Sequence, residues 1–360
     1  MSATFKSFEA FVVLIGDSPV ANVSGIHHPR TPRFIARAGI GDKIDYGESQ
    51  CNPTMFQVVQ LIKDIPVGRS TNDIRQIVED VVNESKSFLA KEQLSDSRGN
   101  ESFDQGVVRH VRALVLNTLL ATLAKHNGVP LWQTLLDYVN SDSRMNGYQF
   151  EKKRDAVDFA FYGFFNLGTD NARLAGLDYE QSAIRGNAML SYVRDRRVWD
   201  NVDDVVDFFR KGLELTGCKS AKLKGGVFDP WYEVRVMKAL KAEMPKINWI
   251  WDPNGAMQTA ELAHEICGEL ASICQFIEDP VLTQETMSET QRLLGKFPLA
   301  TNMCAPDMAA HESARKSRAF DISLAGDIHY SGGMDNSLQF AHWCLPVSYT
   351  HLTLPTIYSV

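Results

Sequence analysis

The sequence lacks the features of several protein classes. Its 360 residues include six cysteines, none of them in a CxxC pair, which favours reduced, mostly buried thiols over a disulfide framework or a zinc knuckle. The apolar run Phe11–Ile15 is far shorter than the roughly 18 residues of a membrane span. No signal-peptide cleavage region follows it. We therefore expect a cytoplasmic protein without membrane contact.

An excess of basic residues is also missing. There are 37 basic and 44 acidic residues, for a formal net charge of -7, which argues against a broad cationic surface for nucleic acid. The glycine pairs 225–226 and 332–333 lack the spacing of a nucleotide-binding loop. An anionic ligand must therefore be met by a few local lysines.

The pattern of apolar residues divides the chain into two parts. In residues 1–150, a strand-like opening is followed by an apolar stripe from Val108 to Leu123, which predicts a helix ending at Gly128-Val129-Pro130. In residues 151–345, short apolar runs alternate with amphipathic segments of helical length. We expect an α+β domain over 1–150 and successive βα units over 151–345.

The spacing of the βα units is regular. The polar residues that end five successive runs are 28, 26, 24 and 25 residues apart: Lys224, Asp252, Glu278, Asn302 and Asp327. A strand, a helix and two short loops take about that length. The α/β fold class predicted is a (β/α) TIM-like barrel, whose strand ends converge on one mouth. An open doubly wound sheet is the alternative, but it would not gather five consecutive strand ends.

Lys222 and Lys224 lie two residues apart on a predicted strand, so both side chains project to one face. A solvated edge strand would give the same pattern. In a barrel mouth of low dielectric, however, burial can bring the pKa of a lysine down to about 7 to 8, and the neutral amine can then act as a base.

Oxygen ligands end the next three strands. Asp252 and Glu278 are each followed closely by proline, which ends a strand, and Asn302 follows the next run. A single Asp-Pro turn is usually structural. Three such oxygens in register form a hard set suited to Mg²⁺. Two carboxylates cancel the charge of the ion, so the pocket can accept an anion such as a substrate carboxylate, whose α C–H would become acidic.

Four segments then resemble the enolase superfamily, specifically its glucarate dehydratase and related acid-sugar dehydratase branch, which is also related to mandelate racemase. They are Lys222-Leu223-Lys224-Gly225-Gly226, Asp252-Pro253-Asn254-Gly255-Ala256, Glu278-Asp279-Pro280 and Ala300-Thr301-Asn302-Met303. The resemblance implies that residues 1–150 form a capping domain over the barrel. It also implies that Lys224 abstracts a proton with Lys222 as its electrostatic partner, and that Asp252, Glu278 and Asn302 bind Mg²⁺.

Four further residues receive roles by the same resemblance. Asp327 is similar to the sixth-strand aspartate that orients a catalytic histidine on the seventh strand. Asn254 resembles a substrate contact, and His27 and Tyr162 resemble residues that close over the substrate. Taken singly, a histidine or tyrosine more often satisfies local hydrogen bonds.

The resemblance implies a Mg²⁺-dependent dehydratase of carbohydrate acid catabolism. It would abstract the proton α to a carboxylate of an aldarate or aldonate and eliminate the β-hydroxyl to give a 2-keto-3-deoxy acid. A racemase or epimerase of a hydroxy acid on the same scaffold is the nearest alternative. A catalytically dead metal-binding chain is another. The sequence is compatible with a homo-oligomer.

The C-terminal residues depart from the family pattern. A histidine in a Gly-Ser-His-Ser-Asn-like run should follow Asp327 by some 25 residues, but the chain after Trp343 has no such run, and the setting of His351 does not match it. We interpret residues 346–360 as a non-family tail on a barrel truncated after its sixth strand. Such a barrel would leave the edges of its first and sixth strands unpaired.

Overall fold

The computed structural model describes residues 3–16, 20–22, 25–26, 30–51, 53–94, 106–145, 160–166, 202–305, 308–324 and 331–344. Its strands are β1 (Phe5–Gly16), β2 (Val20–Asn22), β3 (Gly25–Ile26), β4 (Arg30–Ile40), β5 (Lys43–Gln50), β6 (Ala160–Asn166), β7 (Ser220–Lys224), β8 (Asn248–Asp252), β9 (Cys274–Glu278), β10 (Leu299–Thr301) and β11 (Ile322–Ser323). Its α-helices are α1 (Pro53–Ile62), α2 (Ile74–Lys91), α3 (Val107–Asn127), α4 (Leu131–Asn140), α8 (Val202–Thr216), α9 (Pro230–Glu243), α10 (Ala260–Leu270), α11 (Gln284–Leu294), α12 (Met308–Ser317) and α14 (Met334–Cys344). Short 3₁₀ turns lie at Thr71–Asp73 and Ser143–Met145.

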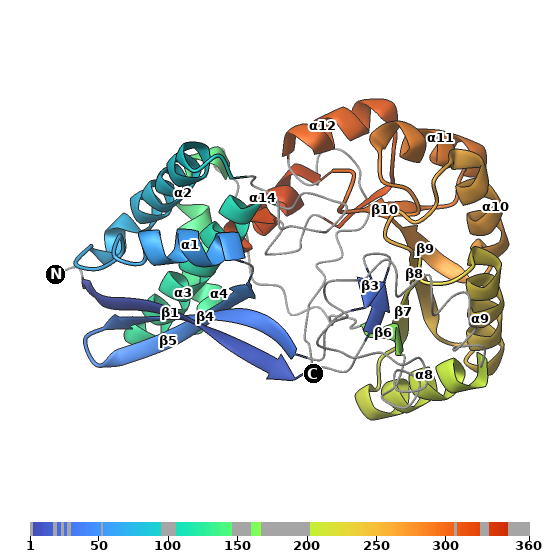
Figure 1. Ribbon diagram of the computed structural model, residues 1–360, viewed down its shortest axis with the longest axis horizontal. Helices are drawn as coiled ribbons and strands as arrows, with labels where there is room; N and C mark the ends of the chain where they lie inside the picture. Colours follow the sequence, from blue (N-terminus) through green and yellow to red (C-terminus); the bar gives the residue numbers. More distant parts are fainter. Residues whose placement is uncertain are drawn as a thin grey trace.

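An antiparallel sheet and four helices form the N-terminal part of the molecule. The sheet has the order β1-β4-β5, and helices α1 to α4 lie together beside it on the left in Figure 1. Along β4, alternate side chains from Phe34 to Ile40 are buried, as expected for a strand with one face in a core. These strands and helices share one hydrophobic cluster, which extends from Phe5 to Leu120.

Helix α3 runs through this core and confirms the helix predicted from the apolar stripe. It ends at Gly128, whose φ of 68° is the left-handed conformation that glycine adopts at helix ends. Among the described residues, α3 alone has the length and hydropathy of a membrane span, but 72% of that stretch is buried inside the protein. Burial of this kind is typical of the core helix of a packed domain.

Six parallel strands, β6 to β11, lie side by side in chain order. Helices α8 to α12 follow the outer side of the curved sheet in Figure 1. A second hydrophobic cluster, from Val205 to Phe320, fills the space between strands and helices. The six strands are the βα units expected from the spacing, and they fit a (β/α) barrel that is incomplete.

The first parallel strand is paired at the carboxyl end of its outer edge, so the prediction of an open edge was wrong for that end. Strand β2 pairs antiparallel with β6, with Val20 opposite Asn166 and Ala21 opposite Phe165, and β3 pairs with β2. The N-terminal segment therefore covers the last two residues of β6 with a short hairpin. At the other side, β11 is the last strand of this sheet in the described part of the chain.

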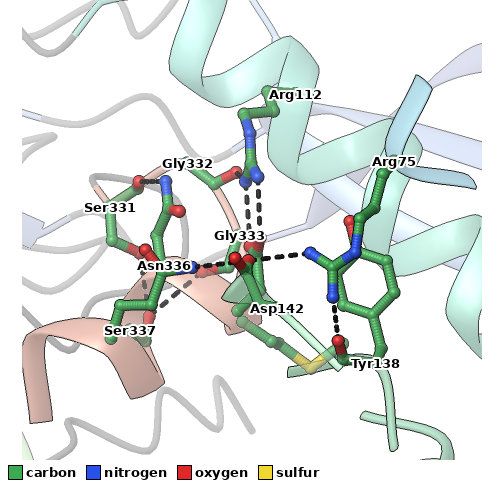
Figure 2. Close-up of polar contacts among 12 residues, drawn as sticks. Arg75, Arg112, Tyr138, Asp142, Ser331, Gly332, Gly333, Asn336 and Ser337 are labelled. Atoms are coloured by element: carbon green, nitrogen blue, oxygen red, sulfur yellow. Dashed lines mark hydrogen bonds and ion pairs between the residues drawn. The ribbon is translucent and has the colours of Figure 1, made fainter. Parts of the chain in front are cut away.

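Polar contacts join the N-terminal helices to α14 (Figure 2). The Arg112 guanidinium on α3 donates to the Asp335 carboxylate and to the carbonyl of Gly332. The Asp142 carboxylate accepts from Arg75 Nη1 at 2.7 Å and from Gln339 Nε2 at 3.4 Å. Residues far apart in the sequence are thus held together where the two parts meet.

Candidate active site

Strand alternation places the two predicted lysines on the inner face of the parallel sheet. On β7, Ala221 and Leu223 are fully buried in the cluster between strands and helices. Lys222 and Lys224 therefore point to the opposite face. Residues of the later strands form a separate small apolar cluster that includes Ile250 and Phe276. The sheet thus carries its polar groups on the face that a barrel turns toward its axis.

The lysines meet the predicted carboxylates at the carboxyl ends of the strands. Lys222 Nζ lies 2.8 Å from Asp252 Oδ2 and 2.5 Å from Glu278 Oε2. Lys224 Nζ lies 2.6 Å from the same Asp252 oxygen and donates to Asn254 Oδ1. The register of the parallel strands explains the contact between Lys224 and Asp252, because these two residues lie opposite each other in β7 and β8. Both carboxylates are buried.

The pKa values follow from this pairing. Burial opposes the lysine charges, but the neighbouring carboxylates outweigh it, so the pKa of Lys222 and that of Lys224 lie above the usual range. Burial likewise opposes the charge of Asp252, but the two ammonium groups lower its pKa to about 2. The expectation of a lysine pKa near 7 to 8 is therefore wrong for this arrangement, in which each ammonium group is paired.

A third carboxyl group, Asp279, was not selected from the sequence. It is fully buried and accepts hydrogen bonds from the Thr301 hydroxyl and from the backbone N–H groups of Asn302 and Met303. Burial, followed by the nearby charges of Glu278 and Asp252, raises its pKa to about 8. Asp279 thus holds the turn that carries Asn302. Its position between Glu278 and a proline was the available signal.

The remaining predicted residues have different outcomes. Asn254 is buried beside Lys224 in a left-handed conformation with φ 51°. The Tyr162 ring on β6 is 44% exposed, with its centroid 5.0 Å from Lys222 Nζ and 6.0 Å from Lys224 Nζ. Asn302 directly follows β10. His27 and Asp327 lie outside the described residues.

The donor set can be compared with the chemistry of Mg²⁺. Within the described ranges, no group of three His, Cys, Asp or Glu side chains is arranged to hold a metal ion, so a site here needs Asn302 as its third ligand. Asp252 and Glu278 already share one cation, the Lys222 ammonium. Two carboxylates on adjacent strands and one amide oxygen are ligands that Mg²⁺ accepts while keeping places for water and substrate. The residues therefore fit the ion.

Comparisons with known proteins show which family the chain resembles. Residues 204–351 match the family described as enolase C-terminal domain-like. A probable glucarate dehydratase of Streptomyces coelicolor is 28% identical over 339 residues, which span 92% of this chain and 70% of the relative.

Solved structures show the same fold. An enolase from Gibberella zeae, crystallised with magnesium, formate and sulfate, is 23% identical with a TM-score of 0.74, over 98% of this chain and 75% of its own. A variant of L-talarate/galactarate dehydratase with Mg and L-glucarate bound is 16% identical with a TM-score of 0.68, over 96% and 75%. Residues 204–351 therefore belong to the enolase C-terminal domain-like family, and over nearly its whole length the chain is similar to enolase-superfamily proteins of the glucarate dehydratase type.

Proposed function

We propose that this protein is a Mg²⁺-dependent acid-sugar dehydratase of the glucarate dehydratase type. It would remove the proton α to a substrate carboxylate and eliminate the β-hydroxyl, giving a 2-keto-3-deoxy acid. The observation that carries the proposal is the contact of two lysines with two buried carboxylates at the ends of three adjacent parallel strands. A probable glucarate dehydratase among the relatives, and a dehydratase of similar fold crystallised with L-glucarate, support this substrate class.

Each residue of the cluster has a role in this proposal. Asp252, Glu278 and Asn302 hold Mg²⁺, which when bound supplies positive charge that acidifies the α C–H of a substrate carboxylate. Lys224 takes the proton. Lys222 lies beside it, and its positive charge opposes the neighbouring carboxylates, which raise the pKa of Lys224. Mg²⁺ on the same carboxylates would weaken their effect and so favour the neutral Lys224 amine before substrate attack. The positive charge of Lys222 also stabilises the enediolate.

The substrate would lie over the inner face of β7. Two ammonium groups favour an anionic ligand, while Tyr162 and Asn254 contribute a ring and an amide next to them. His27 would close over the substrate from the N-terminal part. Asp327 would take the place of the aspartate that orients a seventh-strand histidine in the family, although no matching histidine run follows Trp343 in this sequence. We also propose that residues 1–150 form the capping domain and 151–345 the partial barrel. The two separate hydrophobic clusters support that division.

The test is exchange of the substrate α-proton in heavy water, followed by NMR, with Mg²⁺ and glucarate or related aldarates and aldonates. We expect exchange with the wild-type chain and at least a hundredfold loss in Lys224→Ala. Lys219→Ala, at an exposed position just before β7, is the matched control and should keep the wild-type rate. Equal exchange in wild type and Lys224→Ala would remove Lys224 from the mechanism.

Product analysis distinguishes the alternatives. A 2-keto-3-deoxy acid supports dehydration, whereas an unchanged formula with inverted configuration indicates a racemase or epimerase. Calorimetric binding of Mg²⁺ and glucarate without exchange or product would indicate a noncatalytic chain.

A further inference from the structure

Glu233 is a buried carboxylate outside the lysine and carboxylate cluster. It lies in the first turn of α9 and is fully buried. It accepts four hydrogen bonds of 2.9 Å, from the backbone N–H groups of Gly226, Val227 and Phe228 and from the Trp251 indole. Burial raises the pKa of Glu233, and the four donors oppose that effect. A carboxylate with both oxygens used in this way fixes the groups that surround it.

The four donors belong to the ends of two strands that carry active-site residues. Gly226, Val227 and Phe228 form the turn that directly follows Lys224 on β7, and Trp251 is the residue before Asp252 on β8. A backbone hydrogen bond of 2.8 Å from Gly225 N to the Asp252 carbonyl joins the same two strand ends. Glu233 thus links the backbone that follows Lys224 to the indole of Trp251, the residue before Asp252.

The packing around this carboxylate leaves no space for side chains. A Cβ on Gly225 would lie 2.2 Å from Trp251 Nε1 and 2.4 Å from Glu233 Oε2. Gly226 has φ 74°, and a Cβ there would lie 2.2 Å from the Pro253 carbonyl oxygen. The glycine pair therefore lets the turn close onto Glu233, which gives the Lys-Leu-Lys-Gly-Gly sequence a packing reason beyond the turn itself.

We propose that Glu233 is a positioning residue of the active site, acting through Lys224 and Asp252 without touching the substrate. The effect of Glu233 on catalysis rests on the proposed function, in which Lys224 is the base and Asp252 a metal ligand. Displacement of a reacting group by about 1 Å can cost on the order of a hundredfold in rate. Because Glu233 fixes the ends of β7 and β8, it sets the positions of both the proposed base, Lys224, and one proposed metal ligand, Asp252.

The test uses Glu233→Gln, which keeps the side-chain shape but turns one acceptor into an N–H donor facing other donors. In this variant we expect the Mg²⁺ dissociation constant to rise about tenfold or more, as it does when other residues that orient metal ligands are changed. We also expect faster amide hydrogen exchange at residues 226–228. Lys224 should also be acylated faster relative to Lys238 of the same chain. Glu261→Gln, at an exposed glutamate in the first turn of α10, should change none of these.

A second pair of variants separates positioning from loss of stability. Trp251→Phe removes one donor and keeps the other three, so it should give smaller changes of the same sign even if Glu233→Gln does not fold. Leu240→Ala, at a buried position of α9, lowers stability but should leave the relative acylation of Lys224 unchanged in native conditions. Wild-type Mg²⁺ affinity, exchange and acylation in Glu233→Gln would overturn the proposal.

The two proposals fail in different ways. A wild-type chain that neither binds Mg²⁺ nor exchanges the α-proton would contradict the proposed function alone. In that case the exchange at 226–228 and the acylation of Lys224 still decide the role of Glu233, because both are measured without metal or substrate.

Discussion

The carboxylate of Asp335 accepts hydrogen bonds from both terminal nitrogens of Arg112, at 2.9 and 2.7 Å, although the two residues lie 223 positions apart in the chain. The Asp335 side chain is fully buried and that of Arg112 is 15% exposed. Two parallel hydrogen bonds between a guanidinium and a carboxylate make a stronger ion pair than a single contact does. It links α3 of the N-terminal part to α14 at the end of the described chain (Figure 2).

Asp335→Ala should therefore lower the free energy of unfolding by about 3 kcal/mol, because the Arg112 charge would stay buried without its partner. Urea unfolding followed by circular dichroism measures this change. Glu289→Ala is the control: it removes an exposed partner of Arg292 and should cost less than about 1 kcal/mol. An equal decrease in the free energy of unfolding in both variants would show that the buried pair stabilises the fold no more than the exposed pair does.

Lys222→Met should destabilise the chain without metal by on the order of 3 kcal/mol, since the shared cation between Asp252 and Glu278 disappears. Added Mg²⁺ should restore more stability to this variant than to the wild type. Thermal unfolding with chelator and with Mg²⁺ tests both points. Lys238→Met, which breaks a half-exposed pair with Glu269, should show no such dependence on Mg²⁺.

Glu278→Gln should abolish the stabilisation that Mg²⁺ gives to the folded chain. For a single site this stabilisation is about 2.7 kcal/mol at a hundredfold excess over the dissociation constant. The measurement is the shift of the unfolding midpoint on titration with Mg²⁺. Glu285→Gln, at an exposed position in the first turn of α11, should keep the full shift. A Mg²⁺ shift that persists in Glu278→Gln would place the ion elsewhere.

Gly226→Ala and Gly268→Ala should change stability in opposite directions. The first adds a Cβ at φ 74° that would lie 2.2 Å from a carbonyl oxygen, so we expect a loss of at least about 1 kcal/mol. The second adds a Cβ on α10 with nothing within 4 Å, so we expect a gain of about 0.5 to 1 kcal/mol. Chemical unfolding of the two variants compares them directly.

Spacing along the chain was enough to predict where the strands end. Lys224, Asp252 and Glu278 are the last residues of β7, β8 and β9, because a strand, a helix and two loops repeat with nearly constant length and proline or glycine stops each strand. The helix through Leu114 was equally predictable from its apolar stripe and its glycine end. These features are local, so sequence patterns report them.

Features that depend on contacts between distant residues were not predictable. The protonation of Lys224 depends on the Asp252 oxygen 2.6 Å away, and spacing alone does not give such a distance. Glu233 resembles any acidic residue in a first helical turn until the folded turn shows its four donors. The pairing of Ala21 with Phe165 joins two segments that no periodicity relates.

The hairpin of β2 and β3 has a consequence for synthesis of the chain. Because domains fold from the N-terminus as they leave the ribosome, Val20–Asn22 emerges long before β6, its antiparallel neighbour, has been translated. The hairpin therefore stays without its β6 partner until residues 160–166 have been synthesised. Only then can β2 pair with Phe165 and Asn166. A fragment translated from residue 151 would lack β2. The carboxyl end of β6 would then be unpaired and could form hydrogen bonds with strands of other copies of the fragment.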